Sequence, residues 1–353
     1  MQDKKTSSNV QIDTTRRKVC FFAYVRDKKI LGLSEFYHND IKILKDLGFE
    51  VKIATKFSEI PFNCDLYFSW WWGTGVQALL KAKLLNKPII MVGNVRYGKN
   101  APPVFPKANR LKLLFLKISW YYANAILTTS MFEYNIVAQY RQRNLFMLYH
   151  GIDTNIYKPN SNRKRDNILF TICNLYKSNA QRKRIKETIE AFSMVLKRFP
   201  HYKLIVSGGN AGFKDNTMEH LVSLVEKLGI KNKVIFTGSI SLDKKLHFYQ
   251  TAKLFVQPSI YEGFGLAIAE AMACSTPVVV CRTGAVPEVV GNCGVYVTGN
   301  PESIADGIIG LLKNKNLRKK MGIRARKRIE DKFAYDRRKE QIKKIINKLI
   351  CKR

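Results

Sequence analysis

Short apolar runs alternate with longer stretches of helical spacing along the first half of the chain. The apolar run at residues 18–25 has the length of a buried strand, residues 35–47 have the spacing of an amphipathic helix, and residues 48–55 supply a second strand. Further short strands are expected at residues 64–69, 88–92 and 125–129, with helical stretches between them. This alternation predicts an α/β domain built on a parallel, doubly wound sheet.

The same alternation restarts in the second half, after a segment punctuated by Gly and Pro at residues 150–159 and a polar run at residues 160–167. Strands are expected at residues 168–172, 203–207, 234–237, 254–257 and 277–280. We therefore predict two Rossmann-like domains, at residues 16–150 and 151–332. Residues 1–15 are polar and are expected to form a disordered tail.

Length and cysteine content agree with this organisation. At 353 residues the chain exceeds the size at which a single core usually stops growing. The seven cysteines are scattered, with no CxxC pair and no Cys/His cluster, so reduced thiols in the cytoplasm and no bound metal are expected. No run reaches the roughly 18 uncharged apolar residues that span a bilayer, and charged residues follow the first apolar run where a signal peptide would be cleaved.

Positive charge dominates the composition. The chain has 61 Lys and Arg against 27 Asp and Glu, a formal net charge of +34. Such an excess predicts attraction to a polyanion, and nucleic acid, anionic lipid and phosphorylated substrates all qualify. A Lys-rich surface that is merely solvated is the alternative, because charge alone names no partner.

The most specific chemistry lies in residues 262–270, with the sequence Glu-Gly-Phe-Gly-Leu-Ala-Ile-Ala-Glu. Gly263 and Gly265 let backbone approach a ligand closely, and a helix beginning near Phe264 would point its N–H groups at a diphosphate. Glu262 would then lie near a sugar ring, while Glu270, two turns later, would accept hydrogen bonds from ribose hydroxyls. Alternating alanines at residues 267–273 argue against simple surface exposure of these carboxylates.

These pieces resemble, in order, glycosyltransferase family 4, a retaining family of the glycosyl transferases group 1 type with the GT-B fold. The two Glu separated by seven residues resemble that family's donor motif, and residues 283–288 resemble the stretch that follows it. Residues 150–153 look like the family's interdomain step, residues 183–192 like its Lys-containing helix, and residues 31–34 stand where a Gly-rich loop belongs. The chain departs from the family at Leu31, Asn94 and Asn174. These departures leave open which sugar is transferred and whether the chain has kept transferase activity.

The resemblance implies two Rossmann-like domains facing a cleft, with residues 333–353 forming a helix that crosses back onto the first domain. It implies that Lys183, helped by Lys177 or Arg182, neutralises the donor diphosphate and stabilises the leaving nucleotide. Glu262 and Lys183 are the expected catalytic residues, and the leaving phosphate accepts the acceptor's proton without a protein base or a metal. Donor contacts are also expected from Gly32, Gly209, Ile240, Gly263, Phe264, Gly265, Leu266 and Glu270.

A stretch without any acid, between Leu66 and Phe132, carries nine Lys and Arg and all four Trp. Trp70, Trp71 and Trp72 follow a predicted strand, where an aromatic platform for an acceptor sugar would stand, beside Asn94. Burial of these rings in the core is the alternative.

The predicted helix at residues 109–122 has more apolar surface than one core-facing stripe needs. We predict that Leu113, Leu116 and Trp120 dip into a membrane interface while Arg110, Lys112 and Lys117 meet lipid phosphates. Packing of both faces inside the domain is the alternative. The basic C-terminal stretch, residues 313–353, is expected to add to the same surface.

The resulting functional prediction is a transferase that moves a hexose-type sugar from a nucleotide-sugar to a glycan or lipid-linked acceptor. It would act in cell-surface polysaccharide, lipopolysaccharide or glycolipid synthesis, in the cytoplasm at the face of an anionic membrane, without nucleic acid. A nucleotide-sugar epimerase or phosphorylase, and a non-catalytic polyanion-binding protein on the same fold, are the alternatives.

Overall fold

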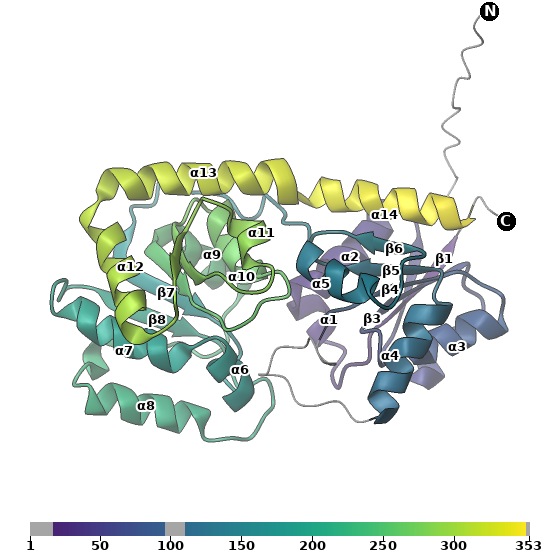
Figure 1. The fold of residues 1–353 in the computed structure, drawn as a ribbon, viewed down its shortest axis with the longest axis horizontal. Coiled ribbons are helices and arrows are strands. Elements are labelled where there is room, and N and C mark those ends of the chain that lie inside the picture. Colours follow the sequence, from purple (N-terminus) through teal and green to yellow (C-terminus); the bar gives the residue numbers. More distant parts are fainter. Residues whose placement is uncertain (1–16, 96–109, 351–353) are drawn as a thin grey trace, which may run out of the picture.

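The computed structural model describes residues 17–95 and 110–350, which form two α/β domains lying side by side (Figure 1). The predicted tail, residues 1–15, lies outside the described residues. Each domain contains a six-stranded sheet in which all paired strands run parallel. The predicted fold class, two doubly wound Rossmann-like domains, is confirmed.

The first sheet has the strand order β2-β1-β3-β4-β5-β6. Its strands are β1 (Lys18–Phe22), β2 (Glu50–Ala54), β3 (Leu66–Trp70), β4 (Ile89–Val92), β5 (Ala125–Thr128) and β6 (Leu145–Met147). The helices of this domain are α1 (Ile30–Leu33), α2 (Glu35–Asp46), α3 (Val76–Leu84), α4 (Arg110–Tyr122) and α5 (Met131–Ala138), with a single 3-10 turn at Phe57–Glu59.

The second sheet has the order β12-β11-β10-β7-β8-β9. Its strands are β7 (Asp166–Ile172), β8 (Lys203–Ser207), β9 (Val234–Phe236), β10 (Ala252–Gln257), β11 (Val278–Cys281) and β12 (Val295–Val297). The helices are α6 (Lys177–Arg182), α7 (Ile185–Leu196), α8 (Thr217–Lys227), α9 (Leu242–Thr251), α10 (Leu266–Ala273), α11 (Val286–Val290), α12 (Pro301–Lys313) and α13 (Lys315–Phe333).

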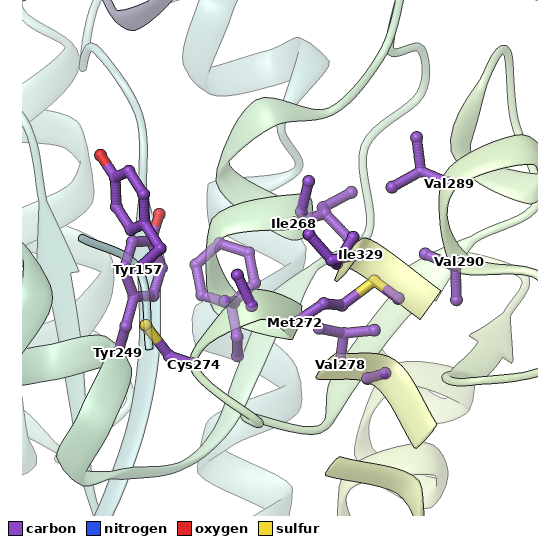
Figure 2. Packing of buried hydrophobic residues seen from close by; sticks show 14 of the residues in the cluster. Tyr157, Tyr249, Ile268, Met272, Cys274, Val278, Val289, Val290 and Ile329 are labelled. Carbon is purple, nitrogen blue, oxygen red and sulfur yellow. The ribbon is translucent and has the colours of Figure 1, made fainter. Parts of the chain in front are cut away.

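The strands are continuous apolar runs because helices cover both faces of each sheet. In β11, for example, every residue from Val278 to Cys281 is buried. Residues on α10 pack between the second sheet and α13: Ile268 and Met272 lie against Ile329, as Figure 2 shows. This packing fixes the helix that carries Glu270, and burial of such side chains contributes about 1.5 to 3 kcal/mol each.

The last helix, α14 (Tyr335–Ile350), crosses back from the second domain to the first, as predicted (Figure 1). Ile342, Ile345 and Ile346 join the core on the α2 face of the first sheet. The Arg338 guanidinium is buried and binds both oxygens of Asp40 at 2.7 and 2.9 Å. Because α3 and α4 pack on the opposite face of that sheet, α14 does not extend the α4 surface, contrary to our prediction.

Candidate donor-binding site

The loop between β10 and α10, residues 258–265, carries the most specific part of the sequence motif. Gly265 begins α10 with a φ of +96°, a left-handed conformation that favours glycine. A Cβ on Gly263 would overlap the Asn94 amide and lie 2.9 Å from Glu133 Oε1. Both of those side chains belong to the first domain. Residues 258–265, which we name the donor loop after their predicted ligand, are therefore in direct contact with that domain.

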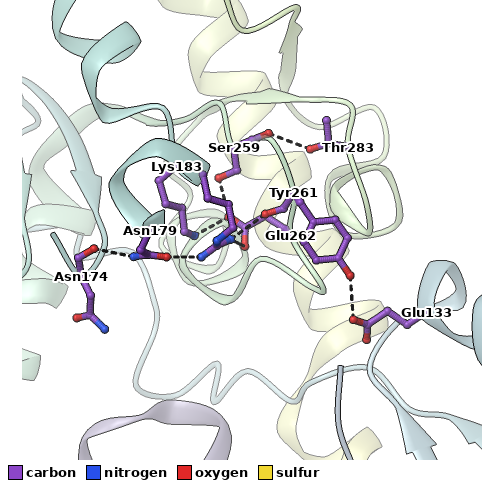
Figure 3. A network of polar contacts seen from close by, with 9 residues as sticks. Glu133, Asn174, Asn179, Lys183, Ser259, Tyr261, Glu262 and Thr283 are labelled. Atoms are coloured by element: carbon purple, nitrogen blue, oxygen red, sulfur yellow. Dashed lines mark hydrogen bonds and ion pairs between the residues drawn. The ribbon is translucent and has the colours of Figure 1, made fainter. Parts of the chain in front are cut away.

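Glu262 lies at the centre of a buried charge cluster, shown in Figure 3. Its Oε1 accepts hydrogen bonds from Lys183 Nζ at 2.5 Å and Ser259 Oγ at 2.6 Å, and its Oε2 pairs with Arg182 Nη1 at 3.2 Å. Burial acts to raise the pKa of Glu262, but the charges of Lys183 and Arg182 outweigh it and hold the pKa at about 2. Two cations and one carboxylate leave this cluster with one net positive charge for a donor phosphate.

The orientation of this cluster is set by backbone contacts. Arg182 donates to the Tyr261 carbonyl at 2.7 Å and to Asn179 Oδ1 at 2.6 Å. The Ile260 N–H in turn donates to the Arg182 carbonyl at 2.7 Å. The end of α6 and the donor loop are therefore tied together in both directions, which places Lys183 and Glu262 side by side.

Glu270 occupies a second buried network that reaches the first domain. Its carboxylate accepts from the Tyr249 hydroxyl at 2.8 Å and pairs with Lys245 at 3.3 Å, and Lys245 also pairs with Glu35 of α2 at 3.1 Å. The Tyr157 hydroxyl donates to the same Glu35 at 2.5 Å. Burial, and secondly the nearby Glu35, raise the pKa of Glu270. The carboxylate predicted to bind ribose thus lies at the contact between the domains.

The other predicted donor residues differ in their surroundings. Lys177 is exposed at the start of α6, where its N–H donates to Asp215. A Cβ on Gly209 would overlap Ser239, so the loops after β8 and β9 approach each other closely there. Ile240 and Leu266 pack at the edge of the core, and the Phe264 ring is buried within it.

Gly32 does not lie in a Gly-rich loop, contrary to the prediction for residues 31–34. Residues 31–33 belong to the short helix α1 and Ser34 ends it. Leu31 is buried in the core, and nothing lies within 4 Å of a Cβ built on Gly32. No close approach at this position requires glycine.

The three consecutive Trp do not form one exposed platform. Trp70 is the last residue of β3, stacks on His150 and donates to Asp40, while Trp72 packs against Trp120; both are fully buried. The prediction of an acceptor platform is therefore wrong for these two residues. The strand β3 extends to Trp70, one residue further than predicted, and the Trp72 ring turns into the core, where it donates to the Met91 carbonyl. Trp71 is half-buried, with a φ of +67°.

The predicted membrane-inserting face of α4 is wrong for Trp120, which is buried against Trp72. Leu113 and Leu116 are half-buried, and Leu116 packs against the same core cluster. The outward face shows other apolar residues together with Arg110, Lys112 and Lys117, which are exposed as predicted. The exposed apolar residues on α4 and the neighbouring α3 are Leu80, Leu84, Leu111, Leu114, Tyr121 and Tyr122.

Glu133 is a site residue that the sequence analysis missed. It lies at the third position of α5, fully buried, and accepts from the Tyr261 hydroxyl at 3.0 Å across the domain contact (Figure 3). The spacing Ser130-x-x-Glu133 is typical of a helix start, and Ser130 Oγ does accept from the Glu133 N–H. That spacing signals a helix cap and gives no hint of a partner in the other domain.

Comparison with known proteins gives a family match for the second domain. Residues 154–328 match the family model described as glycosyl transferases group 1. An uncharacterized glycosyltransferase of Methanocaldococcus jannaschii is 34% identical over 157 residues, 44% of this chain and 39% of that protein. A D-inositol 3-phosphate glycosyltransferase of Corynebacterium jeikeium is 34% identical over 166 residues, 46% and 39% of the two chains. This chain thus spans about two fifths of the length of these relatives.

Solved structures share the fold of the whole chain. HepE of Anabaena in complex with UDP-glucose has a TM-score of 0.76 at 17% identity, covering 94% of this chain and 100% of its own. Sucrose-phosphate synthase of Thermosynechococcus elongatus has a TM-score of 0.76 at 16% identity, covering 96% and 100%. The two domains and the returning helix therefore have the GT-B arrangement.

Proposed function

We infer that this chain, whose residues 154–328 belong to the glycosyl transferases group 1 family, is a glycosyltransferase that moves a hexose-type sugar from a nucleotide-sugar donor to a glycan or lipid-linked acceptor. The observation that carries the proposal is the buried cluster of Glu262, Lys183 and Arg182 in the donor loop. HepE, a protein of the same fold, was solved with UDP-glucose, which supports a nucleotide-sugar donor.

The cluster provides the groups that a sugar-nucleotide needs. The donor diphosphate would approach the net positive charge of Lys183 and Arg182, and charge that develops on the leaving phosphate in the transition state is stabilised there. Glu262 would accept a hydrogen bond from a hydroxyl of the transferred sugar, in place of one of its contacts with these cations. Glu270 would accept from the ribose, in place of or beside Lys245.

The proton of the acceptor has a destination within the substrates. The bond from the anomeric carbon to the phosphate oxygen breaks, the acceptor oxygen bonds to that carbon, and the leaving phosphate takes the acceptor's proton. No protein base is then needed, and the product keeps the anomeric configuration of the donor.

A thermal-shift screen against sugar nucleotides, followed by an assay of nucleoside diphosphate release, tests the proposal. A ligand that binds only the native state raises its Tm. Glu262→Gln should abolish the release while the protein stays folded. The matched control is Glu226→Gln, which breaks an exposed ion pair with Lys231 and should leave the rate unchanged. No shift and no release with any sugar nucleotide would contradict the proposal.

The acceptor side of the reaction lies on the first domain in this proposal. Trp71 follows β3 and is the one member of the Trp triplet with a partly open ring. The outward face of α3 and α4 combines exposed Leu and Tyr with Arg110, Lys112 and Lys117, which suits a membrane interface carrying anionic lipid. The association that we propose is peripheral, at the cytoplasmic face. Among the described residues no helix is long and apolar enough to cross a membrane.

The second candidate is a polyanion-binding protein without catalysis. The net charge of +34 and the two departures at Asn94 and Asn174 favour it. Tight, salt-sensitive binding of RNA, together with no release from any sugar nucleotide, would select this candidate.

A further inference from the structure

Glu133 has an unusual position for an acidic residue in a helix. Its side chain is 0% exposed, and burial raises its pKa to about 7, although hydrogen bonds from Tyr261, Val95 and Thr129 oppose the effect. These donors are the Tyr261 hydroxyl at 3.0 Å, the Val95 N–H at 3.2 Å and the Thr129 hydroxyl at 3.1 Å. An acid is costly to bury, so a role in packing alone would be filled more favourably by an apolar residue.

The contacts of Glu133 join the first domain to the donor loop. Its Oε1 binds both Tyr261, from the donor loop, and the Val95 N–H, just after β4. Oε1 also lies 2.9 Å from the position of a Cβ on Gly263, so the loop passes directly over it. Tyr261 precedes Glu262 in sequence and its carbonyl accepts from Arg182. One hydrogen bond therefore connects α5 to the cluster that would hold the donor.

We propose that Glu133 is a positioning residue for sugar transfer: through the Tyr261 hydroxyl it fixes the donor loop, and with it Glu262, against the first domain. This inference rests on the proposed function. Donor and acceptor are held by different domains, so the anomeric carbon meets the acceptor oxygen only when the loop has one defined position. A displacement of about 1 Å is enough to reduce such a reaction by about 100-fold.

The charged and titratable groups around Glu133 come from several elements. Tyr261 and Arg182 lie on the side of the donor loop, and burial raises the pKa of the Tyr261 hydroxyl, which therefore stays a donor. Glu288 of α11 accepts from the first N–H groups of α5, which is the helix that carries Glu133. Protonation of Glu133 on Oε2 leaves Oε1 able to accept from the Tyr261 hydroxyl, so the link from α5 to the donor loop does not depend on the charge of Glu133.

The first test needs no substrate. In amide hydrogen exchange, residues 258–265 should exchange faster in Glu133→Ala and in Tyr261→Phe than in the wild type. Glu133→Gln should behave like the wild type, because its Oε1 still accepts from Tyr261 and the Thr129 hydroxyl can turn to accept from the amide. The matched control is Tyr67→Phe, which removes a hydroxyl bond of 2.6 Å to the Pro61 carbonyl within the first domain.

The second test measures kcat and KM. Glu133→Ala and Tyr261→Phe should each lower kcat by about tenfold, and the double variant should be no slower than Glu133→Ala, since both act through one bond. Glu133→Gln should keep most of the activity, because its Oε1 still accepts from the Tyr261 hydroxyl. If Glu133→Ala fails to fold, Tyr261→Phe carries both tests.

Unchanged exchange of residues 258–265 in the folded variants overturns the proposal. So does a Glu133→Gln variant as inactive as Glu133→Ala, which would assign Glu133 to a direct role on the substrates. Additive losses in the double variant would do the same. A wild-type protein that turns over no sugar nucleotide defeats the proposed function instead, and the exchange measurement still decides the role of Glu133.

Discussion

At the scale of single residues, the candidate site contains one carboxylate that the sequence predicted and another that it did not. Glu262 was predicted from a motif of two Glu with glycines between them, and it does lie beside Lys183 and Arg182. Glu133 was not predicted, because nothing in its local sequence indicates a bond to Tyr261, more than 120 residues later. Local sequence identifies a loop with its own chemistry, whereas a partner supplied by another domain is visible only after folding.

Low pH should reduce the free energy of unfolding, because it protonates Glu262. Its pKa is lowered in the folded state from an ordinary value of 4.5 to about 2, so its ionised form stabilises the fold above pH 4.5. This stabilisation is lost as the pH falls from about 4.5 to 2. In urea unfolding across this range, Glu262→Gln should show a smaller change in the free energy of unfolding than the wild type. An identical pH dependence in the two proteins would contradict the assignment.

Removing Lys183 should cost both stability and activity. In Lys183→Ala, Arg182 alone is left to face the buried Glu262 carboxylate, and breaking a buried pair in this way costs about 3 to 5 kcal/mol. Denaturant unfolding measures the loss. The exposed pair of Lys231 and Glu226 provides the control, since Lys231→Ala should change stability by less than about 1 kcal/mol.

Gly263→Ala tests how closely the donor loop approaches the first domain. The new Cβ would overlap the Asn94 amide and crowd Glu133, so these side chains or the donor loop must shift, and turnover should fall about tenfold or more. Gly310→Ala in α12 is the matched control: nothing lies within 4 Å of its Cβ, and alanine in a helix stabilises by about 0.5 to 1 kcal/mol. Equal rates in the two variants would show that the contact is not needed for turnover.

At the scale of elements, α5 begins on a side chain from the other domain. The Met131 and Phe132 N–H groups donate to the two oxygens of Glu288, each at 2.7 Å, and Tyr149 donates to the same carboxylate. Unpaired N–H groups and the positive end of the helix dipole both favour an anion there. The sequence analysis assigned Glu288 to a family motif, and the structure shows a helix cap across the domain contact.

Glu288→Ala should favour separation of the domains. Loss of a capping carboxylate costs about 0.5 to 2 kcal/mol, and here the cost falls on the closed arrangement. Small-angle scattering should show a larger radius of gyration than in the wild type. Glu302→Ala, which removes an exposed acid from the first turn of α12 in its own domain, should leave the radius unchanged.

We predict that the exposed face of α3 and α4 binds anionic membranes. Flotation with liposomes should show binding that requires anionic lipid and weakens in high salt. Replacing Leu84, Leu114 and Tyr121 by Ser should reduce it further, since these three side chains are exposed. Leu317→Ser, on an exposed part of α13, is the control. Equal binding to neutral and anionic vesicles would remove the membrane from the proposed function.

At the scale of the whole molecule, the architecture followed from the sequence more fully than the site did. Buried parallel strands read as continuous apolar runs, so five strands of each sheet were predicted from pattern alone. The edge strands β6 and β12 were missed because each has three residues and is only partly buried. The packing of the Trp triplet was not predicted either, because a ring at the end of β3 has the same local sequence whether it stacks on His150 or faces solvent. The networks around Glu270 and Glu133 join the two domains and depend on how the domains close.

Activity should persist without a divalent metal. Lys183 and Arg182 supply positive charge at the proposed diphosphate position, where a metal ion would otherwise neutralise the phosphates. Turnover in EDTA should therefore equal turnover in buffer. A complete loss that added magnesium restores would show that the donor needs a metal.

The return of α14 to the first domain has a consequence for how the protein is made. The core on the α2 face of the first sheet includes Ile342, Ile345 and Ile346, and Arg338 neutralises the buried Asp40. A ribosome synthesises these residues after both sheets, long after β1 to β6. Of the two domains, the one that is made earlier is therefore the later to complete its core, and until α14 follows it exposes the apolar surface that α14 covers.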